Sequence, residues 1–293
     1  MLARRSILLS ALTFALLAAL PAASPAKTIN VHPQGPASNP LQKAINRADP
    51  GDRIRVHHGR YRKAIEVDKR LEIFAARDER RPVIDARCYD SIVVDVQANG
   101  VSLDGLKIQG SADAFTVNFI NISRGKVNDL KLVNTCGQAL YGVNVYGEGA
   151  IRITNNDARG YRDAGYYVGS IATTGNGSLV IANNTASGNN RGAIVEDSFD
   201  TDVDIRVIGN DFHDNTIEGE GIPSGIFVHN SDHALFANNR TDDNGVYGIH
   251  VDPQSDDNVI DDNQASGNGT ANYFDEGTGN CGAGNSFLIP PCV

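Results

Sequence analysis

Residues 142–251 contain five segments with one shared pattern, a glycine followed by apolar residues at the first and third positions after it. They read GVNV (142–145), GYYV (165–168), GAIV (192–195), GIFV (225–228) and GIHV (248–251). Apolar residues at every second position are typical of a short β-strand with one buried face. The glycines are 23, 27, 33 and 23 residues apart. This period predicts a solenoid of stacked coils, with insertions in the middle coils at about Ser170–Ser178 and Thr216–Ser224.

Asparagine is a second marker that recurs in step with the glycines. The chain holds 28 asparagines, about twice the usual share. Asparagine tolerates left-handed backbone angles, and stacked asparagines can hydrogen-bond from coil to coil. We therefore expect a structural ladder inside the turns, and no functional site, at Asn134, Asn156, Asn184, Asn210, Asn239 and Asn263.

Helical periodicity is confined to one segment near the start of the mature chain. Residues 40–48, PLQKAINRA, place apolar side chains at helical spacing and end before the turn Pro50–Gly51. Because the first coil of a solenoid exposes its core and its strand edges, a cover is needed there. The segment predicts an N-terminal capping helix, and the strands begin after it.

The first 26 residues have the pattern of a secretory signal peptide. Arg4 and Arg5 precede the apolar run from Ile7 to Leu20, and small residues follow up to Ala26. No later segment is apolar for the length that a membrane span needs. We expect residues 27–293 to form one domain, because no linker divides them. The signal peptide predicts a secreted or periplasmic protein, and we expect it to be a monomer.

Removing residues 1–26 changes the formal net charge from −9 to −11. An acidic chain without clusters of lysine and arginine is a poor nucleic-acid binder. Carboxylates suit cation binding instead.

Four cysteines in an exported chain permit disulfides. Cys281 and Cys292 are close in sequence, and we expect them to pair and fasten the last coil. Cys88 and Cys136 are 48 residues apart, about two coils. Equivalent positions two coils apart are about 9.6 Å from each other, too far for a disulfide. We therefore expect these two cysteines to be buried free thiols.

Two stretches of this sequence carry a resemblance to a known family. They are LQKAINRADPGDRIRVHHGRYRKAIEVDKRLEIFA (41–75) and NCGAGNSF (280–287). The first resembles the cap helix, PGD turn and G-x-Y strand that open pectate-lyase-like right-handed parallel β-helices. The second is similar to a closing element of that superfamily. Among its members, the chain is most similar to the carbohydrate-binding and sugar-hydrolase repeat group, which includes NosD-like periplasmic proteins. The resemblance implies the fold and a carbohydrate ligand.

The motifs of the superfamily's best-known enzymes are missing. Asp242–Asp243 is present, but the Gly-His-Gly and Arg-Ile-Lys motifs of polygalacturonases are not. The chain contains no tryptophan, which excludes the Trp-containing motif of extracellular pectate lyases. Since a fold alone does not assign an activity, function has to be argued from a site.

The strand register predicts such a site. If the first and third residues after each glycine point inward, the second and fourth point outward. Glu196, His229 and Asp252 then form one column across three successive coils. His250 shares this face, and Tyr167, Phe227 and Arg191 lie beside the column.

Histidine beside carboxylates suits proton transfer near neutral pH. We assign acid–base roles to Glu196, His229, His250 and Asp252, and substrate contacts to Tyr167, Phe227 and Arg191. Glu196 and Asp252 are also candidate Ca²⁺ ligands, since Ca²⁺ would neutralise a uronate. Glu218 and Glu220 in the second insertion would help to wall the groove.

Two functions agree with this pattern. One is a lyase or epimerase that acts on an acidic polysaccharide, and less favoured is a hydrolase. The other is a non-catalytic polysaccharide-binding or envelope scaffold protein, in which the column is merely a cross-strand pair on a solvated sheet. A metal-assembly role is disfavoured because the only methionine is Met1.

Overall fold

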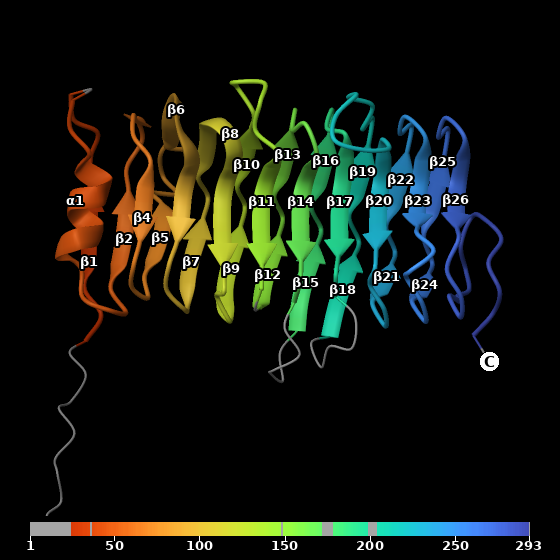
Figure 1. Cartoon of the computed structure of the whole chain (residues 1–293). Coiled ribbons are helices and arrows are strands. Elements are labelled where there is room, and N and C mark those ends of the chain that lie inside the picture. Colours follow the sequence, from red (N-terminus) through yellow and green to blue (C-terminus); the bar gives the residue numbers. More distant parts are fainter. Residues whose placement is uncertain (1–24, 36, 148, 172–177, 199–203, 293) are drawn as a thin grey trace, which may run out of the picture.

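The computed structural model describes residues 25–35, 37–147, 149–171, 178–198 and 204–292. This part of the chain folds as a parallel β-solenoid of about nine turns whose coils stack along one axis (Figure 1). Each strand pairs in parallel with its equivalent in the next coil, as Ala193 does with Ile226. The predicted all-β solenoid is confirmed. The predicted signal peptide lies, apart from residues 25 and 26, outside the described residues.

The strands form two sheets. In spatial order, the ten-stranded sheet contains β1 (Thr28–Val31), β2 (Arg53–Val56), β5 (Glu72–Ala75), β7 (Val101–Asp104), β9 (Arg124–Asn128), β12 (Ala150–Thr154), β15 (Ser178–Ala182), β18 (Asp204–Ile208), β21 (Leu235–Ala237) and β24 (Val259–Asp261).

The sixteen-stranded sheet consists of two runs, because the long strands β6 (Val83–Val96) and β8 (Lys107–Ile120) pair with both. One run contains β3 (Arg60–Tyr61), β10 (Lys131–Val133), β13 (Asp157–Arg159), β16 (Thr185–Ser187), β19 (Asp211–His213), β22 (Arg240–Asp242) and β25 (Gln264–Ser266). The other run carries the glycine-led segments and contains β4 (Ile65–Val67), β11 (Tyr141–Tyr146), β14 (Ala164–Gly169), β17 (Arg191–Glu196), β20 (Ser224–His229), β23 (Tyr247–Val251) and β26 (Ala271–Asp275).

The predicted cap is helix α1 (Pro40–Arg47), which lies at the N-terminal end of the stack (Figure 1). The side chain of Asn39 caps it by accepting a hydrogen bond from the backbone N–H of Gln42 at 3.2 Å. Leu41 and Ile45 are fully buried, so the helix covers the open core of the first coil. Within the described residues, no helix has the length and apolar character needed to cross a membrane.

Inward side chains of successive coils form one continuous core. Val143 and Val145 are fully buried, as are Ile226 and Val228 three coils later, so the predicted register is confirmed. The glycine at the start of each segment leaves room for a neighbouring strand. A Cβ atom at Gly192 would lie 2.6 Å from Cβ of Phe212, which is closer than side chains pack.

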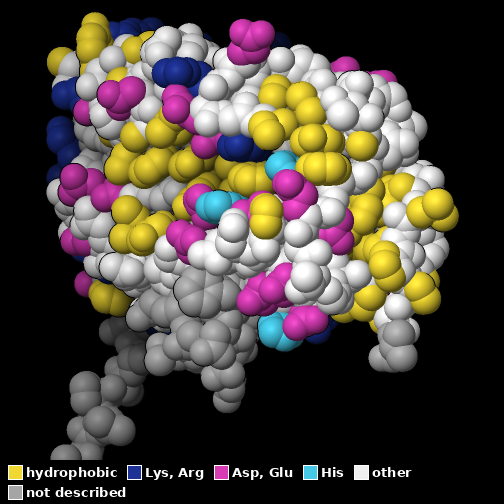
Figure 2. All heavy atoms as spheres, turned by 45° about the vertical axis from the view of Figure 1, so that its right-hand side comes forward, with side chains coloured by type: hydrophobic (Ala, Val, Ile, Leu, Met, Phe, Trp, Pro, Cys, Tyr) yellow, Lys and Arg dark blue, Asp and Glu magenta, His cyan; other side chains and the backbone are white. Residues whose placement is uncertain are grey.

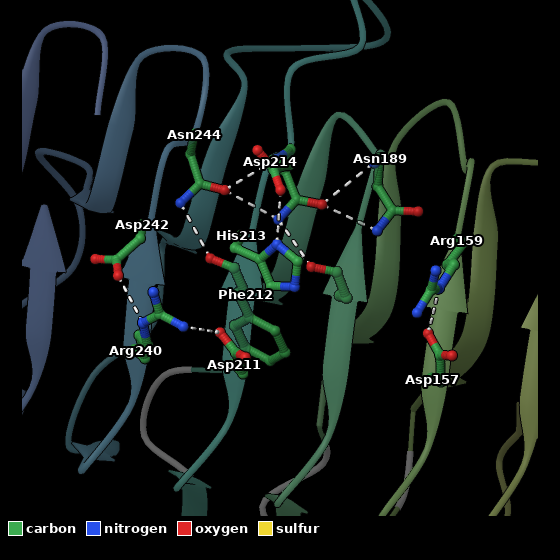
Figure 3. A network of polar contacts seen from close by, with 12 residues as sticks. Asp157, Arg159, Asn189, Asp211, Phe212, His213, Asp214, Arg240, Asp242 and Asn244 are labelled. Atoms are coloured by element: carbon green, nitrogen blue, oxygen red, sulfur yellow. Dashed lines mark hydrogen bonds and ion pairs between the residues drawn. The ribbon is translucent and has the colours of Figure 1, made fainter. Parts of the chain in front are cut away.

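The asparagine ladder is present and buried. The side chain of Asn184 donates to Oδ1 of Asn210 at 3.0 Å, and Asn210 donates to Asn239 at 2.9 Å. A second, parallel ladder runs through Asn189, Asn215 and Asn244 (Figure 3). The prediction was wrong for Asn134, which follows β10 and donates instead to the carbonyl oxygen of Gly160.

The four cysteines form two disulfides. Cys281 pairs with Cys292 as predicted. The prediction for the other two cysteines was wrong, because Cys88 and Cys136 are also bonded, with a Cα–Cα distance of 5.8 Å.

The strand register explains why Cys88 and Cys136 are closer than the distance of about 9.6 Å expected for two coil rises. β6 has four residues between Asp85 and Asp90 where the facing β8 has a single residue, Gly110. The extra residues bulge outward, and Cys88 is exposed there. Cys88 can therefore reach past the coil of β8, which has no such bulge, to Cys136 in the turn that follows β10.

Candidate functional site

The candidate site lies on the outward face of the strand run β11, β14, β17, β20 and β23. Gly169 pairs with Glu196, and Glu196 pairs with His229. The backbone N–H of Asp252 donates to the carbonyl oxygen of Val228 at 3.1 Å, which places Asp252 in the next coil beside His229. The structure therefore brings the three predicted residues of the column together. Figure 2 shows this side of the molecule, where histidines lie among acidic and hydrophobic side chains.

Asp252 orients the imidazole of His229. Oδ2 of Asp252 is hydrogen-bonded to Nδ1 of His229, and Oδ1 accepts from the Ser255 hydroxyl at 2.7 Å and from the Asn230 N–H at 3.1 Å. Burial alone would raise the pKa of Asp252, but these hydrogen bonds together hold the pKa below its ordinary value. Because the ionised carboxylate only accepts, Nδ1 carries the proton and Nε2 of neutral His229 is the acceptor nitrogen.

Glu196 and Tyr167 extend this arrangement. Nε2 of His229 is 3.8 Å from Oε1 of Glu196, and the Tyr167 hydroxyl donates to Oε2 of Glu196 at 2.5 Å. Burial, followed by the contact with Glu196, raises the pKa of Tyr167 well above its ordinary value, so the phenol keeps its proton. The side chains of His229 and Glu196 remain 39% and 30% exposed. Tyr167, Glu196, His229 and Asp252 thus form one line of polar contacts that is open to solvent in its middle.

His250 is on the same face but in a different environment. It is 5% exposed and packs among the rings of Phe227, Tyr247 and Phe274, with centroid distances of 5.0, 4.7 and 5.5 Å. Burial lowers the pKa of His250, opposed by Glu276, whose Oε2 lies 3.3 Å from Nε2. The ring therefore supports the aromatic packing beside the column, away from the His229–Glu196 opening.

Arg191 lies beside the column, but its charge is already paired. Its guanidinium is hydrogen-bonded to Asp163 and lies 4.7 Å from the centre of the Phe227 ring. The residue is only 8% exposed. Burial raises the pKa of Asp163, while the charge of Arg191 opposes this. Arg191 thus fixes Phe227 and leaves little charge for a ligand.

An aromatic row leads to the column from the N-terminal side. Tyr141 stacks on Tyr167 with ring centroids 4.4 Å apart, and Phe115 stacks on Tyr141 at 5.6 Å. The Tyr141 hydroxyl donates to Asp163 at 3.2 Å. Stacked aromatic faces with polar edges suit the apolar faces and hydroxyls of sugar rings.

Sequence reasoning missed part of this site. The missed residues are Tyr141, Asp163, Tyr247 and Glu276. Tyr141 and Tyr247 directly precede the glycines of their segments, just as Arg191 does. Strict alternation puts the residue before each glycine on the inward side, so the pattern carried no signal for them. Glu276 follows a strand without such a glycine, so the pattern carries no signal for it.

The second insertion closes one side of the face, as predicted. Glu220 forms an ion pair with Arg162 at 2.9 Å, which ties the loop to the turn before β14, two coils earlier. A Cβ atom at Gly221 would lie 1.6 Å from Nη2 of Arg191, so the loop backbone packs directly on that guanidinium. Residues 172–177 of the first predicted insertion lie outside the described residues.

The predicted Ca²⁺ ligands do not converge. Asp252 uses both oxygens on neighbouring donors, and His229 lies between it and Glu196. Within the described ranges, no group of three or more His, Cys, Asp or Glu side chains is arranged to hold a metal ion. Calcium stays a prediction without geometric support.

Comparisons with known proteins agree with the architecture. Residues 141–287 match the family model described as a right handed beta helix region. No curated protein matches the chain in sequence. The solved structure of the pectate lyase Pel9A has a TM-score of 0.69 at 13% identity, covering 91% of this chain and 81% of that chain. A rhamnogalacturonan lyase has a TM-score of 0.66 at 15% identity, with 82% and 74% covered.

An alginate lyase from Paenibacillus sp. str. FPU-7 has a TM-score of 0.51 at 17% identity, with 85% and 98% covered. At such low identities, these likenesses show the fold alone. The family match spans half of the chain and includes all strands of the candidate site from β11 to β26. The chain therefore belongs to the right-handed β-helix family, in the pectate-lyase-like form of that fold.

Proposed function

We propose that this protein is a carbohydrate-active β-helix protein that binds an acidic polysaccharide on the outward face of β11–β23 and removes a proton from it at His229. The observation that carries the proposal is the oriented pair Asp252–His229, whose Nε2 lies 3.8 Å from Glu196 at a partly open position. A buried carboxylate that fixes the histidine tautomer leaves a basic nitrogen toward solvent. The lyase chemistry of proteins with similar folds supports the substrate class.

In the lyase reaction, Nε2 of His229 accepts the C5 proton of a uronate residue. The electron pair of that C–H bond forms the C4=C5 double bond, and the bond from C4 to the glycosidic oxygen breaks. The leaving oxygen takes a proton from Tyr167, whose raised pKa keeps the phenol protonated at neutral pH. In the epimerase variant, the C5 carbanion is reprotonated on its other face and no glycosidic bond breaks.

A non-catalytic polysaccharide-binding protein is the second candidate. Arg191, the basic residue predicted to lie beside the column, is paired with Asp163 and buried. The site thus offers little positive charge to acidify the C5 proton of a uronate. The stacked row of Phe115, Tyr141 and Tyr167 would bind sugar rings without any chemistry.

Incubation with polygalacturonate, alginate and neutral glycans, with and without Ca²⁺, tests the proposal. Unsaturated products are read by ultraviolet absorbance, and epimerised sugars by NMR. The matched control for His229→Ala is His213→Ala. It removes another partly exposed histidine, which is paired with Asp214 (Figure 3) and lies on β19, in the other strand run. Turnover by wild type and H213A but not by H229A supports catalysis. Sugar binding without turnover in all three proteins favours the second candidate.

We also infer that the protein works outside the cytoplasm, in the periplasm or after secretion. Its two disulfides support this inference, since structural disulfides persist in oxidising compartments.

A further inference from the structure

A cluster of exposed cations lies on the ten-stranded sheet, on a different face from the His229 site. Arg124 and Lys126 are alternate residues of β9, and Arg152 lies on the neighbouring strand β12. Lys126 and Arg152 are direct partners in the strand register. All three side chains are exposed. The cluster therefore presents three positive charges on two adjacent strands.

Other cations of the same face are neutralised within the protein. Arg53 forms two hydrogen bonds to Glu72, and Arg206 pairs with Asp204 at 2.5 Å. Within the described part of the chain, no carboxylate lies within 4.0 Å of the charged groups of Arg124, Lys126 or Arg152. These three side chains thus differ from their neighbours in having no protein partner there.

The register neighbours of the cluster are uncharged. Ser102 pairs with Lys126 on one side, and Val180 pairs with Arg152 on the other. Like charges directly opposite on adjacent strands repel each other and cost stability. A bound anion would remove that repulsion. The cluster therefore has the charge pattern of a site that is completed by an anionic ligand.

Charge is also distributed unevenly along the whole chain, with the excess of positive charge in the N-terminal coils. Residues 27–152 contain 19 Lys and Arg against 14 Asp and Glu, a net charge of +5. Residues 153–293 contain 5 against 21, a net charge of −16. An extended polyanion is therefore attracted more strongly to the N-terminal coils than to the C-terminal coils. The cluster lies in the basic part of the solenoid.

We propose that Arg124, Lys126 and Arg152 form a second, non-catalytic binding site for a carboxylated polysaccharide lying along the solenoid axis. Adjacent strands are about 4.8 Å apart, so a linear chain parallel to the axis meets Lys126 and then Arg152 with successive charged groups. The apolar register neighbours, Val180 and Ala150, are small, and Ser102 and Thr154 are polar. The cluster therefore lacks the Trp, Phe or Leu anchors that membrane-surface elements use. The identity of the polymer rests on the proposed function, whereas the anion site itself does not.

Affinity electrophoresis in gels that contain polygalacturonate or alginate tests this site without requiring turnover. Wild type should be retarded by these polymers, less so at higher salt, and not by a neutral glycan. The double variant K126E/R152E should bind about tenfold more weakly, since two or three exposed ion pairs contribute about 1–2 kcal/mol in total.

The matched control is K107E/K131E, which makes the same charge change on register partners of another face, on β8 and β10. Equal weakening in both double variants would show that only net charge matters and would overturn the proposal. Binding to anionic lipid vesicles without binding to either polyuronate would also overturn it. Retardation does not depend on turnover, so a failure of the catalytic proposal and a failure of this one are distinguishable.

Discussion

The Tyr167 hydroxyl reaches Glu196 by passing over Gly169, the residue two positions further along the same strand. A Cβ atom at Gly169 would lie 2.3 Å from the Tyr167 oxygen. The glycine thus leaves the space through which the 2.5 Å hydrogen bond to Glu196 is made. The line from Tyr167 to Asp252 depends on a residue that takes no part in any chemistry.

Gly169→Ala should therefore displace Tyr167 and break its hydrogen bond to Glu196. We expect a loss of sugar binding or turnover as large as that of Tyr167→Phe, and a stability loss of about 1–3 kcal/mol from overpacking. Denaturant unfolding and the polyuronate assays measure these effects. Gly35→Ala is the control, because no atom lies within 4 Å of its Cβ position. Full activity in G169A would contradict the role given to Tyr167.

Asp252→Asn should impair His229 and lower stability at neutral pH. Because the pKa of Asp252 is lowered in the folded state, its contribution is present above the unfolded pKa of about 3.9 and is lost as the pH falls below it. We expect D252N to be about 1–3 kcal/mol less stable at pH 7, with a smaller difference from wild type at pH 3. Unfolding titrations at both pH values check this. A difference that grows toward acid pH would refute the assignment.

The buried ring of His250 should make stability fall as the pH drops below about 6.5. Its pKa is lowered by burial in the folded state, so the unfolded chain binds the proton more tightly and acid favours unfolding. Full stability from this group is present above about pH 6.5, the ordinary pKa of histidine. Melting temperatures of wild type and His250→Gln above and below this pH measure the effect. The slope should be smaller in H250Q than in wild type, and an equal slope in both proteins would contradict the assignment.

The two disulfides should differ in what they contribute. Cys88 and Cys136 are separated by 48 residues, and Cys281 and Cys292 by 11. In the chain-entropy model, the longer loop stabilises by about 4 kcal/mol and the shorter one by about 3 kcal/mol. Replacing each pair by serine and measuring unfolding in denaturant tests the order. A larger loss for the C-terminal pair would mean that local contacts outweigh loop entropy.

Much of the fold was predictable because every coil of a solenoid repeats the same pattern of strands and turns. The glycine before each strand and the asparagine in each turn are set by close backbone packing and by left-handed angles, which act between neighbouring coils. Asn134 was misplaced because an asparagine also suits the turn after β10, and residue type alone does not separate the two turns. The Cys88–Cys136 pair was missed because the bulge in β6 breaks the uniform coil spacing.

The sequence predicted which residues of the candidate site share a column, but it did not predict their hydrogen-bond and ion-pair partners. Alternation along β17, β20 and β23 was enough to place Glu196, His229 and Asp252 on one face. It did not show that His250 turns to Glu276 or that Arg191 is neutralised by Asp163. Those partners come from other coils and from side-chain directions that strand periodicity does not encode.

The sequence by itself determined the solenoid, its cap and the order of side chains along each face, because these follow from short-range periodicity and turn chemistry. Only the tertiary structure decided which polar groups are open and which are already satisfied. Burial and charge pairing depend on how the insertion at 216–224 and neighbouring coils cover each side chain. This is why the side chain of His229 stays partly exposed, while Arg191 and His250 are buried in the packing beside the column.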